Sequence, residues 1–150
     1  MADVVTPAVR SRMMSSIKAK DTKPEVKLRS CLHKLGFRFR KNVKDLPGKP
    51  DIVLPKYKAV IFVNGCFWHR HNCDLFRLPS SNTEFWDEKL AKNRTRDLKK
   101  HALLSKIGFR VCIVWECAFR GKNSRTLHEI SLDCKEWLLE GKSDIEIYRP

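Results

Sequence analysis

Apolar positions along the first part of the chain follow the period of a helix. Residues 22–25 (TKPE) have the N-cap threonine, first-turn proline and capping-box glutamate of a helix start. Leu28, Cys31, Leu32 and Leu35 then form one apolar stripe, which Gly36 is expected to end. The pattern predicts a helix from the early twenties to Leu35.

After this helix the period shortens to that of strands. Residues 37–40 (FRFR) alternate between apolar and basic side chains, which predicts a first strand. The apolar runs 51–54 and 59–63 flank a turn-like PKYK segment and predict a hairpin. The second run, AVIFV, is continuous, so we expect it at the centre of a sheet, buried on both faces.

Residues 109–115 (FRVCIVW) predict another buried strand, with a long helix before it and a last helix after it. Asn82 or Thr83 is expected to cap the long helix, which ends near Ile107. Its inward-facing residues are expected to be Phe85, Leu90, Leu98, Ala102 and Leu103. Ser124 is expected to cap the last helix and Gly141 to close it.

The order helix, three strands, helix, strand, helix predicts an α/β fold with a small mixed sheet flanked by helices. The chain has 150 residues, the length of one domain, so residues 1–150 are expected to fold as a single unit. Residues 1–21 lack a sustained apolar period and predict a basic N-terminal arm. Residues 142–150 are expected to form a loose tail.

The chain carries 31 Lys and Arg against 17 Asp and Glu, a formal net charge of +14. Such an excess repels itself in a compact domain and favours a polyanionic partner, with nucleic acid first and an anionic membrane surface second. No apolar run approaches the ~18–20 residues of a membrane span. The sequence therefore predicts a cytoplasmic protein that binds nucleic acid.

Cysteine and histidine gather in residues 62–73 (FVNGCFWHRHNC), where Cys66, His71 and Cys73 have metal-ligand chemistry. A structural zinc site needs a fourth ligand. If residues 109–115 pair beside residues 59–63, Cys117 lies near enough to supply it. His69 competes with His71 as the ligand, and spacing does not separate them. Unliganded loop cysteines with a surface histidine are the alternative interpretation.

Asp51 opens the first strand of the predicted hairpin, close to the end of the neighbouring strand at residues 63–64. This is the bare layout of the PD-(D/E)xK nuclease core, in which carboxylates hold Mg²⁺ for phosphodiester hydrolysis. The second strand of that pattern carries (D/E)xK, which Val63 and Asn64 do not match. An ordinary turn-capping aspartate is the alternative.

The segments LPGKPDIV, VIFVNGCFWHRHNC, TEFW and VWECAFRG together resemble the very-short-patch-repair (Vsr) mismatch endonucleases. The resemblance runs from about Arg10 to Gly121, most of the chain. It implies a restriction-endonuclease-like, degenerate PD-(D/E)xK core with a structural zinc. The implied activity is Mg²⁺-dependent nicking of one DNA strand beside the T of a T:G mismatch left by 5-methylcytosine deamination, which initiates very short patch repair.

The resemblance also assigns roles to residues of this sequence. Asp51 would be the central Mg²⁺ ligand, with the backbone carbonyl of Val63 beside it. Glu25 would act through metal-associated water and His69 at the scissile phosphate. The zinc ligands would be Cys66, His71, Cys73 and Cys117. Asn64 stands where the family commonly has a second histidine, and an amide cannot take a proton near neutral pH.

DNA contacts are expected from aromatic and basic side chains. By the resemblance Phe67, Trp68 and Trp86 would wedge between base pairs at the mismatch, because a mismatched step resists unstacking least. Core packing is the alternative for these three. The phosphate-contacting set is expected to be Arg10, Arg12, Lys18, Lys20, Lys92, Arg94 and Arg96.

The resemblance implies duplex DNA with a T:G mismatch as substrate, a MutL-type repair factor and a cognate DNA cytosine methyltransferase as partners, and a bacterial, nucleoid-associated location. A nick on one strand needs only a monomer. Two other functions fit the same residues: a site-specific restriction-type nuclease on unmismatched DNA, and a catalytically inactive zinc DNA-binding module.

Overall fold

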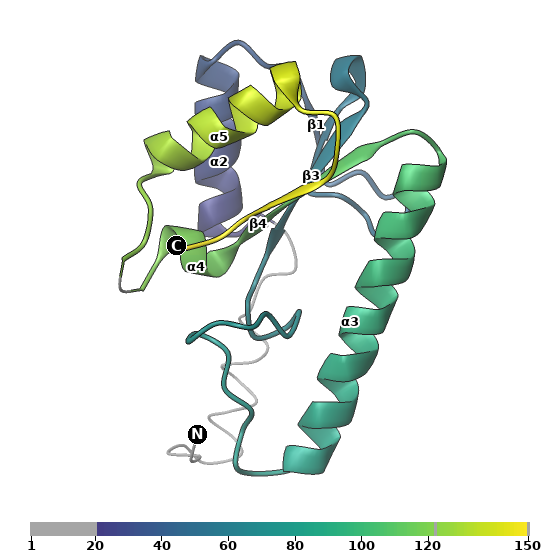
Figure 1. The fold of residues 1–150 in the computed structure, drawn as a ribbon, viewed down its shortest axis with the longest axis vertical. Coiled ribbons are helices and arrows are strands. Elements are labelled where there is room, and N and C mark those ends of the chain that lie inside the picture. Colours follow the sequence, from purple (N-terminus) through teal and green to yellow (C-terminus); the bar gives the residue numbers. More distant parts are fainter. Residues whose placement is uncertain (1–20, 122, 150) are drawn as a thin grey trace.

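A mixed five-stranded sheet lies between helices on both of its faces in the computed structural model, which describes residues 21–121 and 123–149 (Figure 1). The predicted basic residues Arg10, Arg12, Lys18 and Lys20 lie outside these ranges. In chain order the elements are α2 (Lys23–Lys34), β1 (Arg40–Lys41), β2 (Ile52–Leu54), η1 (Pro55–Tyr57), β3 (Ala59–Asn64), α3 (Thr83–Lys106), β4 (Arg110–Trp115), α4 (Glu116–Phe119), α5 (Leu127–Glu140) and β5 (Ile145–Ile147).

The strands follow one another across the sheet in the order β1-β2-β3-β4-β5. The first three pair antiparallel, and β3 with β4 and β4 with β5 pair parallel. The predicted hairpin is confirmed: β2 and β3 are joined by η1, and Lys58 turns the chain at a φ of 50°. β3 has a partner strand on each side, as its continuous apolar run predicts.

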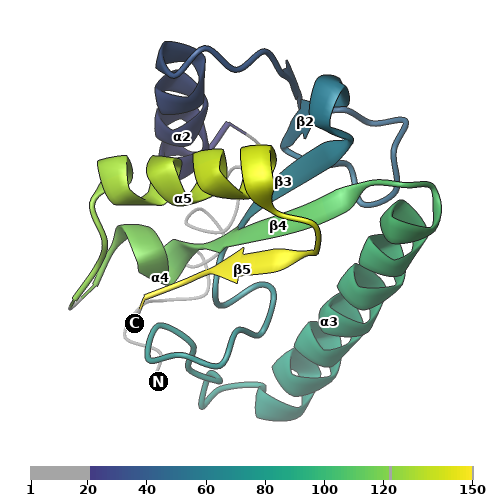
Figure 2. The same ribbon diagram turned by 45° about the horizontal axis from the view of Figure 1, so that its top comes forward.

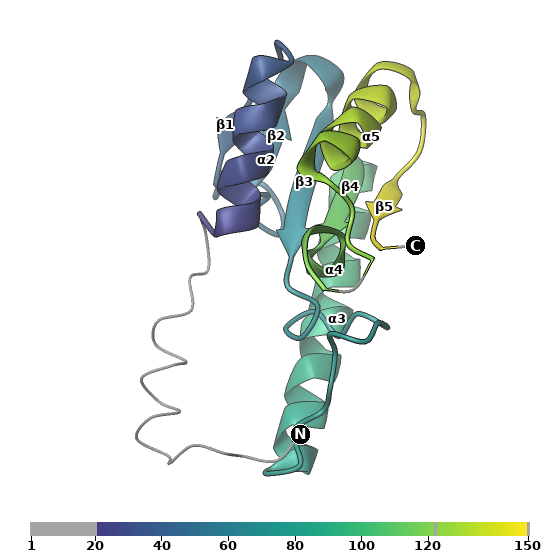
Figure 3. The ribbon, with the colours of Figure 1, turned by 90° about the vertical axis from the view of Figure 1, so that its left-hand side faces the viewer.

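Alternate residues of β3 enter two different cores. Ala59 and Ile61 join the larger core under α2 and α5, while Val60 and Phe62 join a smaller core that includes Leu104 of α3. Figure 1 shows α2 and α5 on one side of the sheet and α3 on the other, and in Figure 3 α2 and α5 lie in front of the sheet with α3 behind it. The predicted α/β architecture with flanking helices is therefore confirmed.

The helix α2 begins and ends where its sequence predicts. Thr22 is the N-cap, and its N–H donates to the Glu25 carboxylate at 3.2 Å. Gly36 follows the C-cap with a φ of +92°, a conformation that glycine adopts without strain. The local signals in this segment agree with the final structure because they need no distant partner.

Two expected boundaries are wrong. Residues 37–39 are not a strand: Phe37 turns into the core against Tyr57, and β1 is limited to Arg40–Lys41 at the edge of the sheet. The cap of the last helix is Thr126, not Ser124. The Thr126 hydroxyl accepts the Glu129 N–H at 3.1 Å, while the Glu129 carboxylate accepts the Thr126 N–H at 3.3 Å, a complete capping box.

The expected inner face of α3 is mostly wrong. Leu90 is buried, but Phe85, Leu98 and Leu103 are 58%, 57% and 45% exposed, and Ala102 is exposed too. Figure 2 shows that α3 runs well beyond the sheet, so much of the helix has no core to face. Polar side chains of α3 instead meet the loop that follows β3.

A loose tail was expected over residues 142–150, but its described part contains a strand. Ile145–Ile147 form β5, which pairs parallel with β4, and Ile147 is buried. Asp144, just before β5, accepts the Val111 N–H at 2.8 Å and starts this pairing. Among the described residues, no helix combines the length and apolar character that a membrane crossing requires.

Candidate functional site

Two carboxylates meet where β2 begins and β3 ends. Asp51 precedes β2, and its Oδ2 accepts the backbone N–H of Val63 at 2.7 Å. Glu25, 1% exposed in the first turn of α2, is hydrogen-bonded to Asp51. Burial, and then this hydrogen bond, raise the pKa of Asp51 to about 8. The two carboxyl groups bring oxygen donors together at one place, and a bound divalent cation would stabilise their ionised forms.

His69 lies on the turn immediately after β3 and is held by a residue far along the chain. Its backbone N–H donates to the Gly65 carbonyl at 3.2 Å, and its Nδ1 lies 2.5 Å from the Asp97 Oδ2 of α3. Both side chains are partly exposed, at 29% and 23%. Because Asp97 engages Nδ1, Nε2 is the ring nitrogen positioned to exchange a proton with a substrate or water.

Asn64, the last residue of β3, is 6% exposed. It lines a cavity of about 330 Å³ together with His69, Asp97 and His101. Burial lowers the pKa of His101, whose ring lies 5.0 Å from that of Phe62. The cavity thus brings a neutral imidazole and the His69–Asp97 pair to the position where the sequence departs from the family pattern.

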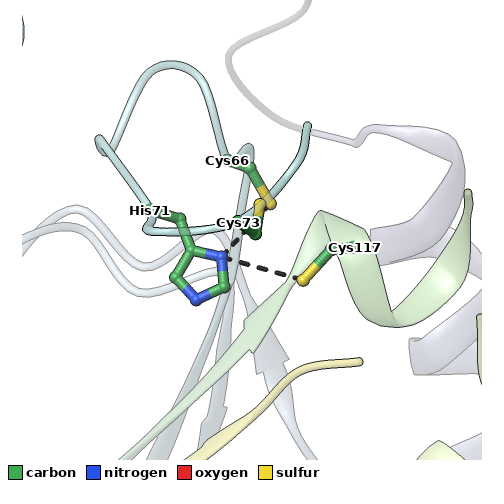
Figure 4. Close-up of side chains that lie close together, drawn as sticks. All are labelled: Cys66, His71, Cys73 and Cys117. Atoms are coloured by element: carbon green, nitrogen blue, oxygen red, sulfur yellow. Dashed lines mark hydrogen bonds between the residues drawn. The ribbon is translucent and has the colours of Figure 1, made fainter. Parts of the chain in front are cut away.

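Cys66, His71, Cys73 and Cys117 converge in one cluster, with their ligand atoms all within 4.8 Å of one another (Figure 4). Three come from the loop after β3 and Cys117 from α4, which directly follows β4. The parallel pairing of β3 and β4, with Asn64 opposite Trp115, brings the two segments together. The conditional prediction that this pairing brings Cys117 to the loop is confirmed.

The distances in this cluster suit a tetrahedral ion. The His71 Nδ1 lies 3.6 Å from the Cys66 sulfur and 3.7 Å from the Cys117 sulfur. A zinc ion with ordinary bond lengths separates such ligands by about 3.6 Å. Burial raises the pKa of the Cys66 and Cys117 thiols and lowers that of His71, so a bound cation is what would stabilise the thiolates.

His71 rather than His69 joins the cysteines. Its ring stacks on Trp115 at 4.0 Å between centroids and 7° between planes, which fixes the imidazole with Nδ1 toward the sulfurs. The Cys66 N–H also donates to the Glu116 Oε1 at 3.2 Å, tying the loop to α4. Geometry therefore separates the two histidines that spacing leaves equivalent.

The aromatic residues predicted to contact DNA lie together beside this loop. Phe67 packs edge-on against Trp68 at 5.1 Å and against Trp86 at 5.5 Å, and the two tryptophans are 5.9 Å apart. All three are half-buried and belong to none of the main core clusters. Phe76 stacks on Phe67 at 6.2 Å and extends the group.

The predicted basic residues on α3 are exposed. Lys92 forms an ion pair with Glu88 at 3.1 Å, and Arg96 donates to Asn93 at 3.0 Å. Arg94 is exposed next to the His69–Asp97 pair and lines the same cavity. These side chains keep their charge at the surface, where a polyanion could reach them.

Two site residues, Asp97 and Phe76, escape sequence reasoning. Asp97 sits among basic residues of a helix whose apolar residues have no single stripe, so nothing local connects it to His69. The signal that was available is its position: Asp97 lies midway between Leu90 and Leu104, on the face of the helix that turns inward. Phe76 lies in an irregular segment that carries no periodic signal.

Residues 2–75 match the family described as DNA mismatch endonuclease Vsr. The chain is 46% identical to the DNA mismatch endonuclease Vsr of Escherichia coli K12, over 95% of this chain and 92% of the relative. It is 52% identical to a type II nicking enzyme of Neisseria meningitidis, V.NmeAIP, over 81% and 87%. It is 47% identical to V.XorIIP, a nicking enzyme of Xanthomonas oryzae, over 78% and 86%.

Proposed function

The chain belongs to the Vsr family of DNA mismatch endonucleases, and from this we propose that it nicks one DNA strand beside the T of a T:G mismatch, with Mg²⁺ at Asp51. Its relatives are named mismatch endonuclease and nicking enzymes, so the chain is a DNA endonuclease. The observation that carries the finer proposal is that Asp51 and the buried Glu25 lie together beside the end of β3, with the His69 turn in the loop that follows. We propose that this is a degenerate restriction-endonuclease-like core.

Asp51 and the backbone carbonyl of Val63 would hold the Mg²⁺ ion, and Glu25 would bind water associated with it. Carboxylate and carbonyl oxygens suit this cation, and the Val63 N–H bond keeps Asp51 in one orientation. A bound Mg²⁺ supplies a charge that stabilises the phosphate oxygens and lowers the pKa of water. Glu25 is too buried to reach DNA itself, which favours a role through the ion and its water.

His69 would act at the scissile phosphate. Its Nδ1 is occupied by Asp97, which orients the ring and leaves Nε2 available to take a proton. Asn64 has no proton to exchange near neutral pH, so the proton transfer falls to His69 and to water. We therefore expect slower turnover than a histidine at this position would allow.

The aromatic group of Phe67, Trp68 and Trp86 would unstack the mismatch. Its rings are held by one another, and the Trp68 carbonyl accepts the Asn93 Nδ2–H at 3.2 Å, so the group meets DNA already assembled. Unstacking a step costs a few kcal/mol and costs least at a mismatch. This difference supports mismatch selection by the loop rather than by the catalytic groups.

Zinc at Cys66, His71, Cys73 and Cys117 would have a structural role, because all four positions of a tetrahedral ion are filled by protein ligands. It would hold both His69 and the aromatic residues, which lie between its ligands in sequence. Lys92, Arg94 and Arg96, with Arg10, Arg12, Lys18 and Lys20, would contact phosphates. From family membership we also propose that the protein acts as a monomer and cooperates with a MutL-type factor and a DNA cytosine methyltransferase. Its proposed location is cytoplasmic and nucleoid-associated.

One cleavage assay tests this function. Labelled duplexes that differ only in a central T:G pair are incubated with Mg²⁺ or with EDTA, using the parent chain and Asp51→Ala. We expect a nick in one strand of the mismatched duplex, lost in EDTA and in the variant. Equal cleavage of both duplexes would support the restriction-type nuclease instead. Binding without cleavage would support the inactive zinc module.

A further inference from the structure

Arg29 of α2 is a buried cation beside the catalytic carboxylates. It is 8% exposed, although arginine is almost never buried without a partner. Its Nη2 donates to the Asp21 Oδ1 at 2.7 Å, and its Nη1 lies 3.5 Å from the Glu25 Oε2. One guanidinium thus spans two acids, and the second is the neighbour of Asp51.

The two ends of this bridge differ in character. Asp21 lies before α2, with a φ of 55° and a side chain that is 41% exposed, and its Oδ1 also accepts the Asn42 Nδ2–H at 3.0 Å. Glu25 is enclosed, and its Oε2 accepts the Thr22 N–H as well as facing Arg29. The outer acid anchors the guanidinium, and the guanidinium limits how the inner carboxylate can rotate.

The bridge does little for the fold by itself. Among the described residues, the Arg29 Nη1 is the buried side-chain atom that lacks a hydrogen-bond partner. An unsatisfied buried donor is costly, and apolar residues of similar size often replace buried ion pairs without loss of stability. A residue kept for packing alone would not need this arrangement.

We propose that Arg29 is a positioning residue for the divalent-cation site: anchored by Asp21, it holds Glu25 in the orientation in which Glu25 and Asp51 receive the ion together. This inference rests on the proposed Mg²⁺ function of Asp51. It goes beyond that function because it gives a role to two residues, Arg29 and Asp21, that are not among the proposed ligands of the ion. The site is thereby coupled to the point where the chain enters α2.

The test measures cation binding directly, without turnover. Mn²⁺ is titrated into the zinc-loaded full-length protein, and free Mn²⁺ is counted by its electron paramagnetic resonance signal; Mn²⁺ takes the same oxygen ligands as Mg²⁺. The variants are R29M, R29K, D21N and the double variant D21N/R29M. R125M is the matched control, because it also removes an arginine from an ion pair. Arg125 lies just before α5 and pairs with Asp133 of that helix. Zinc content and circular dichroism verify the fold of each.

We expect the Mn²⁺ Kd of R29M to rise about tenfold, because the variant loses the ion-pair contact that holds the buried Glu25 carboxylate. R29K is expected to recover part of this loss, since one ammonium can reach one acid but not bridge two. D21N is expected to weaken binding less than R29M, and the double variant no more than R29M. R125M is expected to match the parent.

A Kd for R29M equal to that of R125M would overturn the proposal, and so would losses in D21N and R29M that multiply in the double variant. If R29M fails to fold, D21N decides, and an unchanged Kd there overturns it. If the parent and the Asp51→Ala variant bind Mn²⁺ equally well, and the parent nicks DNA in EDTA, the proposed function is refuted and the inference with it. Asp51-dependent binding with unaffected Arg29 and Asp21 variants would refute the inference alone.

Discussion

Replacing Cys117 with serine is expected to release the loop after β3 from the carboxyl end of β4. Cys117 is 1% exposed on α4, and its sulfur lies 3.7 Å from the His71 Nδ1. Serine is nearly the same size but is a poor ligand for zinc, whose preferred donors are thiolate and imidazole. The remaining three candidate ligands all belong to one short segment, so they cannot tie that segment to the sheet.

The expected loss of stability follows from the length of chain that the ion closes. Zinc bound at both Cys73 and Cys117 would cross-link an interval of roughly 45 residues, and loop-closure entropy for such an interval is about 4 kcal/mol. A domain of this size has a free energy of unfolding of about 5–15 kcal/mol, so the loss is a large share of it. The melting temperature should fall by roughly 10–15 °C.

Zinc content by atomic absorption and urea unfolding by tryptophan fluorescence measure the two parts of this expectation. Trp115 stacks on His71 and reports on the loop directly. Cys117→Ser should contain little zinc, and its urea midpoint should match that of the parent after chelation. Cys31→Ser is the control: Cys31 is half-buried on α2, outside the cluster, and should keep one zinc per chain.

Two results would refute the reasoning separately. Zinc near one per chain in Cys117→Ser would remove Cys117 from the ligand set. Zinc loss without a change in the unfolding midpoint would keep the ligand but refute the cross-link argument, because the loop would then be held by its other contacts.

Three further expectations concern the cavity between α3 and the sheet. Asp97→Asn should slow single-turnover nicking about 10- to 100-fold by misorienting His69, and an unchanged rate at saturating DNA would exclude this role. Because burial lowers the pKa of His101, the parent should lose stability as the pH falls below the ordinary histidine value of about 6.5. His101→Gln should lose less between pH 7.5 and 5, measured by urea midpoints, and equal losses would contradict the assignment. Asn64→His should raise the nicking rate and change its pH profile; identical rates and profiles would show that this position takes no part in proton transfer.

The sequence by itself determines the features that depend on neighbouring residues. The capping box of Thr22 and Glu25 starts α2 without help from the rest of the chain, and the PKYK turn can close the β2–β3 hairpin locally. The ligand chemistry of residues 66–73 is likewise readable, because thiolate and imidazole keep their preferences in any fold. The prediction that Cys117 is a ligand depended on the pairing of β3 with β4, and the two strands do pair in the structure.

The tertiary structure alone decides which distant residues meet. Asp97 reaches His69 across 28 positions, and Arg29 joins Asp21 to Glu25 in a geometry that no periodic pattern encodes. β5 forms because β4 offers it an open edge, so its residues look like a loose tail when considered alone. The inward face of α3 carries polar groups because its partner is the loop of the site rather than an apolar core. The periods of helices and strands reflect burial of apolar residues against a core. They therefore do not predict contacts between polar residues of a functional site.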